Sequence, residues 1–147
     1  MYTHIPVGST PLLEKFLCSM MLDGKKTVVR EIMQDVLEEL KKAGHKNPVE
    51  TFETALRMVM PQIEVRPKRV GGAVYQIPME VNSKRQQSLA IRWILTASRK
   101  KKGKPMYKKL SEEILDALSE QGEAYKKKIE VKKMAEANKA FAHLANY

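Results

Sequence analysis

The sequence predicts a mainly α-helical protein: a six-helix body with a protruding two-stranded antiparallel β-ribbon between the third and fourth helices. Apolar residues recur at helical spacing in six segments. The period changes to two only over residues 63–81, where Gly71-Gly72 can form a tight hairpin turn. With 147 residues, 43% of them hydrophobic, the chain is expected to form a single domain around one core.

The first helix follows a loose lead-in over residues 1–9. Thr10 is suited to cap a helix that starts at Pro11 and ends at Asp23-Gly24. Cys18 lies in the apolar pattern of this helix. We interpret it as a buried structural thiol rather than a nucleophile, which weakly favours a reducing compartment.

The second and third helices are expected over residues 27–43 and 47–61. Gly44 is the expected left-handed cap of the second helix. Asn47 can cap the third helix, while Glu50 can reach back to the Asn47 amide. The chain carries 8 basic and 8 acidic residues through residue 62, so we interpret these three helices as scaffold.

The ribbon is predicted from two alternating segments, residues 63–70 and 73–81. Pro67 and Pro78 cannot donate to a strand ladder, so both strands are expected to be edges. Strands of about eight residues give an arm about 25 Å long. Because an isolated hairpin is only marginally stable, we expect the arm to lean on the body at its base and to be ordered by a partner at its tip.

Three more helices are expected after the ribbon, over residues 83–100, 106–120 and 129–144. A capping box of Ser83 and Gln86 would start the first of them. The last helix belongs to a basic C-terminal region, residues 123–147, and would present four residues on one face: Met134, Ala137, Asn138 and Phe141.

The positive charge of the chain is concentrated in one segment. Residues 63–110 hold 13 Lys and Arg against 2 acidic residues, whereas the other 99 residues hold 14 basic and 15 acidic ones. Such segregation predicts a surface for a polyphosphate partner. No apolar run approaches the roughly 18 residues of a membrane span, and no signal peptide is recognisable, so no membrane partner is expected.

The sharpest candidate site is a stripe on the helix over residues 83–100. Arg85, Arg92 and Arg99 are spaced by seven, which keeps them within about 20° per step on one face. Ser88 and Thr96 fall in the same stripe. Arginine pairs bidentately with phosphate and stacks on bases. The alternative is a solvated face, but such faces normally interleave Glu, and no acidic residue occurs over 81–111.

The hairpin is the second candidate site. Arg66, Lys68 and Arg69 lie on one strand beside the Gly71-Gly72 turn, whose backbone could approach an RNA groove closely. Tyr75 could stack on a base or pack at the root of the arm, and its alignment with neighbouring apolar residues favours packing. The alternative for the whole arm is an edge protected by charge against aggregation.

Further candidate RNA contacts are lysines in turns and in the last helix. Lys132, Lys139 and His143 would lie close to one stripe. The lysine candidates are Lys25, Lys26, Lys84, Lys100, Lys101, Lys102, Lys132 and Lys139.

Catalysis has little support in the sequence. The three histidines show no metal-ligand spacing with Cys18 or with each other, and Gly71-Gly72 is a turn rather than a nucleotide loop. No catalytic residue, metal or cofactor is therefore predicted.

Three stretches resemble small-subunit ribosomal protein seven of the bacterial type: PVETFETAL at 48–56, VRPKRVGGAVYQIPMEV at 65–81 and RQQSLAIRWI at 85–94. The ending KKMAEANKAFAH, at 132–143, is similar to that family's tail. The similarity covers about residues 9–143, and the hairpin stretch is the most specific part.

The resemblance implies a structural protein of translation that binds the 3′ major domain of small-subunit ribosomal RNA and nucleates assembly of the head. It implies a ribbon near the exit-site tRNA and mRNA, a body that meets ribosomal protein eleven, and a location in the small subunit of bacterial cytoplasm or of an organelle (mitochondrion or plastid). Members usually start with a basic arm, but Met1–Thr10 contain no Lys or Arg. Contacts of that arm are therefore not carried over.

Two other hypotheses fit the basic surface. A DNA-bending architectural protein can pair a helical body with basic β-arms, although such proteins are usually dimers of short chains. A helical protein–protein adaptor with incidental basicity would bind its partner with little response to salt.

Overall fold

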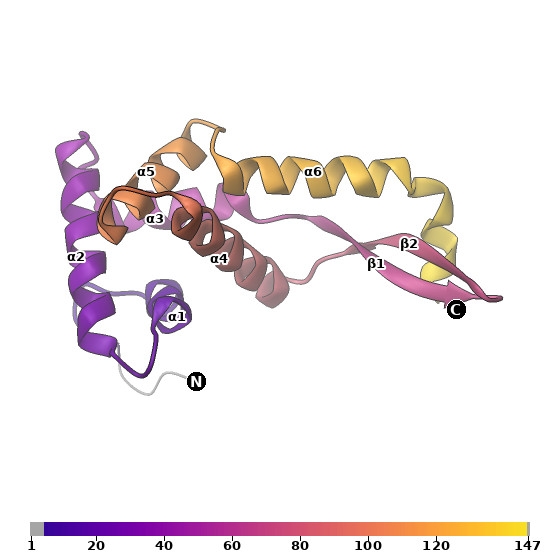
Figure 1. The fold of residues 1–147 in the computed structure, drawn as a ribbon, viewed down its shortest axis with the longest axis horizontal. Coiled ribbons are helices and arrows are strands. Elements are labelled where there is room, and N and C mark those ends of the chain that lie inside the picture. The colour runs from indigo at the N-terminus through magenta and orange to yellow at the C-terminus, as the bar shows by residue number, and fades with distance from the viewer. Residues whose placement is uncertain (1–4, 147) are drawn as a thin grey trace.

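The computed structural model describes residues 5–146 and confirms the mainly helical fold, with a two-stranded antiparallel sheet between the third and fourth helices (Figure 1). The helices and strands are α1 (Pro11–Met20), α2 (Lys26–Lys42), α3 (Pro48–Val59), β1 (Ile63–Val70), β2 (Ala73–Glu80), α4 (Ser83–Lys100), α5 (Met106–Leu118), α6 (Glu123–Ala137) and a 3₁₀ segment, η1 (Lys139–Asn146).

The body is built from the first five helices around one apolar core. Phe16 of α1 and Phe52 of α3 meet edge to face in its centre, with ring centroids 4.9 Å apart. Leu40 of α2, Ile94 of α4 and Leu110 of α5 complete this core and are fully buried. The core therefore fixes α4, the helix of the predicted arginine stripe, by its apolar side.

Side-chain caps start three of the body helices. The Thr10 hydroxyl accepts from the Leu13 amide at 3.2 Å, as predicted for α1. The Asn47 side chain caps α3, but Glu50 accepts from the Asn47 side-chain amide and not from its backbone amide, contrary to prediction. The predicted capping box of α4 is also wrong in position, because the cap is Asn82, one residue earlier.

The ribbon pairs β1 with β2 in register, with Ile63 opposite Glu80 at its base and Val70 opposite Ala73 at its tip. Gly71 and Gly72 both have positive φ values, 59° and 86°, as a tight hairpin turn requires. Among the described residues the sheet has only these two strands, so the ribbon has two free edges.

The C-terminal region differs most from expectation. The last α-helix was predicted over 129–144, but α6 spans 123–137 and η1 follows. The helix ends at Asn138, whose side-chain amide at 2.8 Å and backbone amide at 3.1 Å both donate to the Met134 carbonyl. The predicted shared face of Met134 and Phe141 is therefore wrong.

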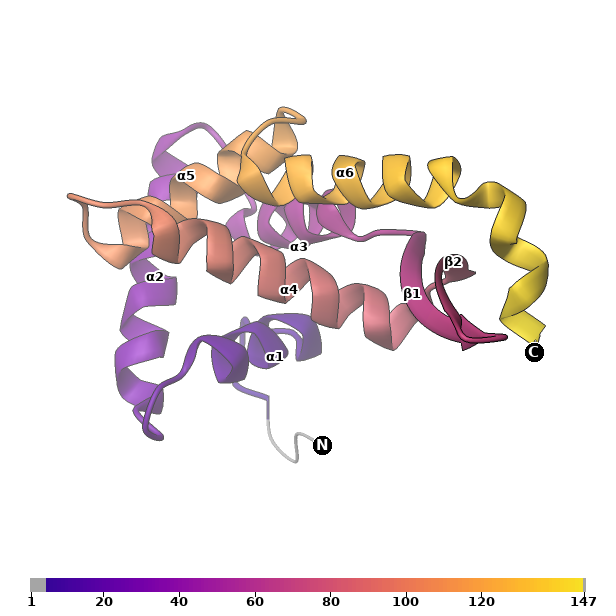
Figure 2. The same cartoon turned by 45° about the vertical axis from the view of Figure 1, so that its right-hand side comes forward.

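This C-terminal region supports the ribbon along its length. Figure 2 shows α6 extending away from the body alongside the ribbon, and η1 folding back toward the strands. Contacts join α6 to β1 and η1 to β2. The ribbon is therefore braced by the chain's own C-terminal segment, whereas the Gly71-Gly72 turn at its tip is exposed.

Of the expected lead-in, residues 1–4 lie outside the described residues, and residues 5–9 contain no helix or strand. Ser9 is nevertheless tied to the body, because its hydroxyl donates to Glu14 at 2.8 Å. No described helix is long and apolar enough to cross a membrane.

Candidate nucleic-acid interface

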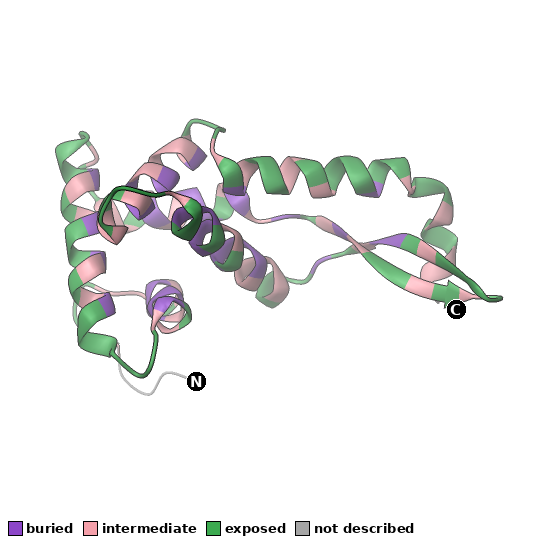
Figure 3. Ribbon diagram, viewed as in Figure 1, coloured by how far each residue is buried: buried purple, intermediate pink, exposed green. Residues whose placement is uncertain are grey.

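The exposed side of α4 carries the arginines of the predicted stripe. Arg92 and Arg99 are exposed, while Ala90, Ile94 and Ala97 on the other side are buried in the core. Figure 3 shows this division along α4 as alternating buried and exposed segments. The fold therefore holds both guanidinium groups on a rigid element with their outer ends available to a ligand.

A hollow between α1 and α4 adds hydroxyl groups to these arginines. Its lining includes Ser19 of α1 and Ser88, Arg92, Thr96 and Arg99 of α4. The Arg99 guanidinium donates to the Met20 carbonyl at 3.3 Å, which fixes it beside the end of α1. Two guanidinium groups and several hydroxyls suit phosphate oxygens, which accept hydrogen bonds from both. Ser19 could not be found from sequence, because it belongs to a distant helix.

Arg85, the third member of the stripe, is engaged within the protein. Its guanidinium donates to the Glu64 carboxylate, with Nη2 3.3 Å from Oε2. Arg66 of β1 also pairs with Glu64, its Nη2 lying 2.9 Å from Oε1. Glu64 is only 8% exposed. One carboxylate thus offsets half of the charge of two predicted RNA-binding residues and ties the ribbon base to α4.

Of the hairpin residues, too, some are exposed and others are bonded within the protein. Arg69 is exposed, whereas Lys68 donates to the Ala145 carbonyl of η1 at 3.3 Å. Tyr75 packs against Phe141 of η1, with ring centroids 5.1 Å apart. Packing was the favoured interpretation of Tyr75, but the partner lies in η1 and the contact is near the tip, since Tyr75 stands opposite Lys68. The turn residues Gly71 and Gly72 are exposed.

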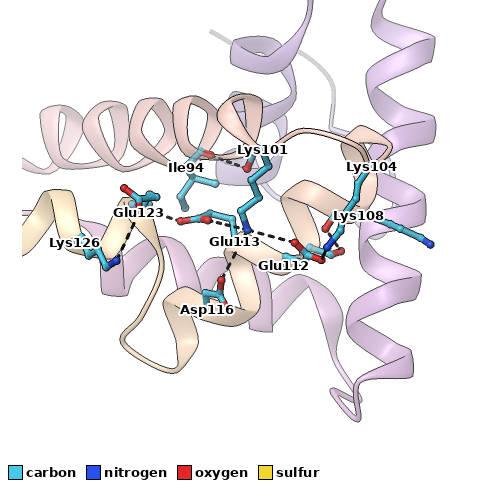
Figure 4. Close-up of polar contacts among 12 residues, drawn as sticks. Ile94, Lys101, Lys104, Lys108, Glu112, Glu113, Asp116, Glu123 and Lys126 are labelled. Atoms are coloured by element: carbon cyan, nitrogen blue, oxygen red, sulfur yellow. Dashed lines mark hydrogen bonds and ion pairs between the residues drawn. The ribbon is translucent and has the colours of Figure 1, made fainter.

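Lys101 is placed in an acidic cluster between α4 and α5 (Figure 4). Its ammonium lies 3.3 Å from Glu113 Oε2, 3.5 Å from Glu112 Oε2 and 3.9 Å from Asp116 Oδ2. Lys104 also pairs with Glu112. The flanking Lys100 and Lys102 are exposed. The chain turns after α4 and brings the first acidic residues after residue 80 beside the lysine run, an arrangement that local charge counting could not predict.

Glu113 is a buried residue that no sequence pattern singles out. Its Oε1 accepts from the Ala124 amide at 2.9 Å, in the first turn of α6. It thereby joins α5, α6 and, through Lys101, the end of α4. A carboxylate at this end of α6 is also favoured by the helix dipole.

The lysines of α6 have different environments. Lys128 donates to the Met58 carbonyl of α3 at 2.8 Å, and burial together with the nearby Lys132 charge lowers the pKa of Lys128. Lys132 on α6 and Lys139 on η1 are exposed. The predicted single stripe of Lys132, Lys139 and His143 is wrong, because the α-helix ends before Lys139.

The remaining predicted lysines are exposed: Lys25 and Lys26 at the start of α2 and Lys84 at the start of α4. Lys84 lines a second hollow with Lys15 of α1 and Arg57 of α3. These two additional cations were not predicted, since their helices are near neutral overall. The described residues contain no group of three or more His, Cys, Asp or Glu that could hold a metal ion.

Comparison with known proteins gives one consistent family. Residues 2–139 match the family described as ribosomal protein S7p/S5e. The chain is 55% identical over 136 residues to a small ribosomal subunit protein uS7 of Rhodopirellula baltica, covering 91% of this chain and 87% of that protein. The protein of the same name from Pseudothermotoga lettingae is 52% identical over 139 residues, covering 95% of this chain and 90% of that protein. The one from Helicobacter hepaticus is 49% identical over 138 residues, covering 94% of this chain and 89% of that protein.

The matched region contains nearly all of the surface described above, from α1 through the ribbon and α4 to α6. With its basic helical body and its ribbon, the chain belongs to the ribosomal protein S7p/S5e family, whose members are structural proteins of translation and not enzymes.

Proposed function

We propose that this protein binds the 3′ major domain of small-subunit ribosomal RNA and nucleates assembly of the head of that subunit. The observation that carries the proposal is the pair of exposed arginines, Arg92 and Arg99, beside the hydroxyl groups of the α1–α4 hollow. The family supports a ribosomal RNA partner, and the basic surface supports its polyanionic character.

The proposed mechanism is electrostatic docking followed by recognition of RNA shape. Arginines and lysines neutralise phosphates, and release of counterions favours the complex. The A-form major groove excludes side chains, so preference would come from the RNA fold and from unpaired bases. If about 6 to 8 phosphates are contacted, the logarithm of affinity falls against the logarithm of salt with a slope of roughly −4 to −7.

The candidate contacts differ in how much of their positive charge is free to bind phosphate. Arg69, Arg92 and Lys102 are exposed and have no carboxylate partner among the described residues, so their whole charge can act on the RNA. Arg66, Arg85 and Lys101 are partly neutralised by Glu64 and by the acidic cluster, so we propose a smaller contribution from them.

The ribbon is proposed to lie near the exit-site tRNA and mRNA, and the body to meet ribosomal protein eleven. The projecting shape of the ribbon and its exposed turn support the first assignment (Figure 1). The bacterial sources of the relatives support the small ribosomal subunit of a bacterial cytoplasm over that of an organelle.

The test is binding of the full chain to a folded 3′-domain RNA fragment by filter retention, with duplex DNA as competitor. Arg92→Glu is expected to weaken binding by about 10- to 100-fold, because charge-assisted hydrogen bonds are lost. Lys41→Glu is a control of equal charge change on the exposed side of α2, away from the basic segment. It should change the affinity by no more than about twofold, as expected for loss of long-range attraction alone.

Circular dichroism checks that both variants keep the wild-type helicity. Equal affinities of the two variants for the RNA fragment would remove α4 from the interface. Preference for duplex DNA over the fragment would contradict the proposed partner.

A further inference from the structure

A third hollow lies on the other side of α4, between this helix and α6. It has a volume of about 320 Å³, within the range of small-ligand sites, and its lining includes Trp93, Thr96 and Lys100 of α4 and Lys126, Lys127 and Glu130 of α6. Thr96 also lines the α1–α4 hollow. The exposed side of α4 therefore forms a ridge with a hollow on each flank, and Thr96 belongs to both.

Trp93 gives this hollow an aromatic wall. It is the only tryptophan of the chain. The side chain is half-buried, packs against the core and leaves part of its surface in the hollow. The π-face of any nucleobase can stack on such a ring, and stacking of this kind tolerates different bases.

The rim of the hollow carries cations that have little internal neutralisation. Lys100, Lys126 and Lys127 are exposed. Among the described residues, Lys100 and Lys127 make no ion pair, and Lys126 pairs only with Glu123 of its own helix at 3.7 Å. These ammonium groups can therefore bind phosphate oxygens at the rim of the hollow.

The lining also contains two acidic residues, Glu123 and Glu130, which restrict what can enter. Glu130 is exposed and makes no ion pair among the described residues. A carboxylate repels a phosphate that enters the hollow but accepts hydrogen bonds from base amino groups. An aromatic wall, a lysine rim and a nearby acceptor together suit a nucleotide whose base points inward and whose phosphate stays at the rim.

We propose that the α4–α6 hollow holds one unpaired nucleotide of bound RNA, with its base stacked on Trp93 and its phosphate held by Lys100, Lys126 and Lys127. The strand then continues over Thr96 toward Arg92 and Arg99. This inference rests on the proposed RNA-binding function and adds a base-binding site to it.

The emission of Trp93 tests the inference directly, because no other tryptophan contributes to it. The full chain is titrated with the folded 3′-domain RNA fragment, and complex formation is followed in parallel by filter retention. We expect tryptophan emission to fall as the complex forms, and to saturate at the same stoichiometry. Complete complex formation with unchanged emission overturns the base site while leaving RNA binding intact. Absence of any complex overturns the proposed function and this inference with it.

Paired variants separate the hollow from general charge effects. Lys126→Ala with Lys127→Ala is compared with Lys41→Ala with Lys42→Ala on α2. All four lysines are exposed, and each pair includes one 3.7 Å ion pair to a glutamate three residues earlier. The α6 double variant is expected to bind the fragment about 10-fold more weakly than the α2 double variant and to show less quenching, because only the former loses phosphate contacts. Equal affinity and equal quenching overturn the proposal.

Trp93 itself is tested by Trp93→Phe and Trp93→Leu. Phenylalanine keeps an aromatic face, whereas leucine keeps apolar bulk without one. Trp93→Leu is expected to bind about 5- to 100-fold more weakly than Trp93→Phe, the range for loss of one stacked base. Equal binding by the two variants overturns stacking, and the lysine comparison decides the case if either variant unfolds.

Discussion

Arg85 of α4 and Glu64 of β1 form an ion pair across the junction between the body and the ribbon, with Nη2 3.3 Å from Oε2. The same carboxylate accepts from Arg66 of β1. Since Glu64 is nearly buried and both arginines remain partly exposed, the carboxylate works as an internal counterion at the base of the ribbon.

Glu64→Gln is therefore expected to lower the free energy of unfolding by about 1 kcal/mol, a modest loss because solvent screens both guanidinium groups. Urea denaturation of Glu64→Gln, Arg85→Gln and the double variant measures the coupling between the two residues. Additive losses would show that the pair contributes nothing. Repeating the cycle in high salt should reduce the coupling.

Gly122 precedes α6 with a φ of 89°, and a Cβ atom there would lie 2.9 Å from Glu113 Oε1 and 3.0 Å from Asp116 Cβ. Gly122→Ala should lower the free energy of unfolding by about 2 to 3 kcal/mol, through backbone strain and displacement of Glu113.

Gly103→Ala is the matched control, because its φ is 81° and no atom lies within 4 Å of the added Cβ. Only the backbone cost of about 1 kcal/mol is expected there. Thermal or urea unfolding compares the two, and equal losses would show that contact with Glu113 does not matter.

Glu14 is buried beneath Arg30, whose Nη2 lies 2.8 Å from Oε2, and it also accepts from Ser9. Burial alone would raise the pKa of Glu14, but the hydrogen bonds from Arg30 and Ser9 outweigh it and hold the pKa below its ordinary value of 4.5. A depressed pKa in the folded state means that this carboxylate stabilises the protein above about pH 4.5. That stabilisation is lost as the pH falls through the lower folded-state pKa.

Glu14→Gln is expected to lower the free energy of unfolding by about 2 kcal/mol at neutral pH, less than for a fully buried pair because Arg30 is partly exposed. The difference from wild type should shrink as the pH falls below about 4.5. Urea midpoints measured across pH check this. Glu31→Gln, at an exposed position of α2, should show no such convergence.

Phe141 holds η1 against the ribbon through Tyr75, with the ring centroids 5.1 Å apart. Phe141→Ala should speed amide hydrogen exchange in η1 by about 2- to 10-fold, which corresponds to losing the interaction free energy of one aromatic pair. Met134→Ala, which removes an exposed apolar side chain of α6, is the control and should leave η1 unchanged. Unaltered exchange in Phe141→Ala would show that Lys68 and the backbone suffice to hold the segment.

The elements that were predicted correctly are those whose signals are local. The Gly71-Gly72 turn, the Thr10 cap and the apolar stripes of α1 to α5 act within a few residues, so the order of the strands and helices could be derived from sequence. The bounds of α6 could not. Its start depends on Gly122 and on a carboxylate eleven residues before Ala124.

The candidate site was predictable in its residue types but not in its partners. The spacing of Arg92 and Arg99 placed them on the exposed side of α4. The carboxylates that engage Arg85 and Lys101 come from β1 and α5, which only the tertiary fold brings near. The aromatic wall at Trp93 was missed for the same reason, since the sequence places this residue on the core side of α4 and its hollow is completed by α6.

Because α6 and η1 contact the strands, the projecting ribbon is held rigidly against its own C-terminal region. A rigid hairpin loses little conformational entropy when it binds a partner, so a larger share of the contact energy is retained as affinity. Motion of the arm is then coupled to motion of the body, so that a force applied at the far end of the ribbon reaches α6 and the body helices that α6 contacts.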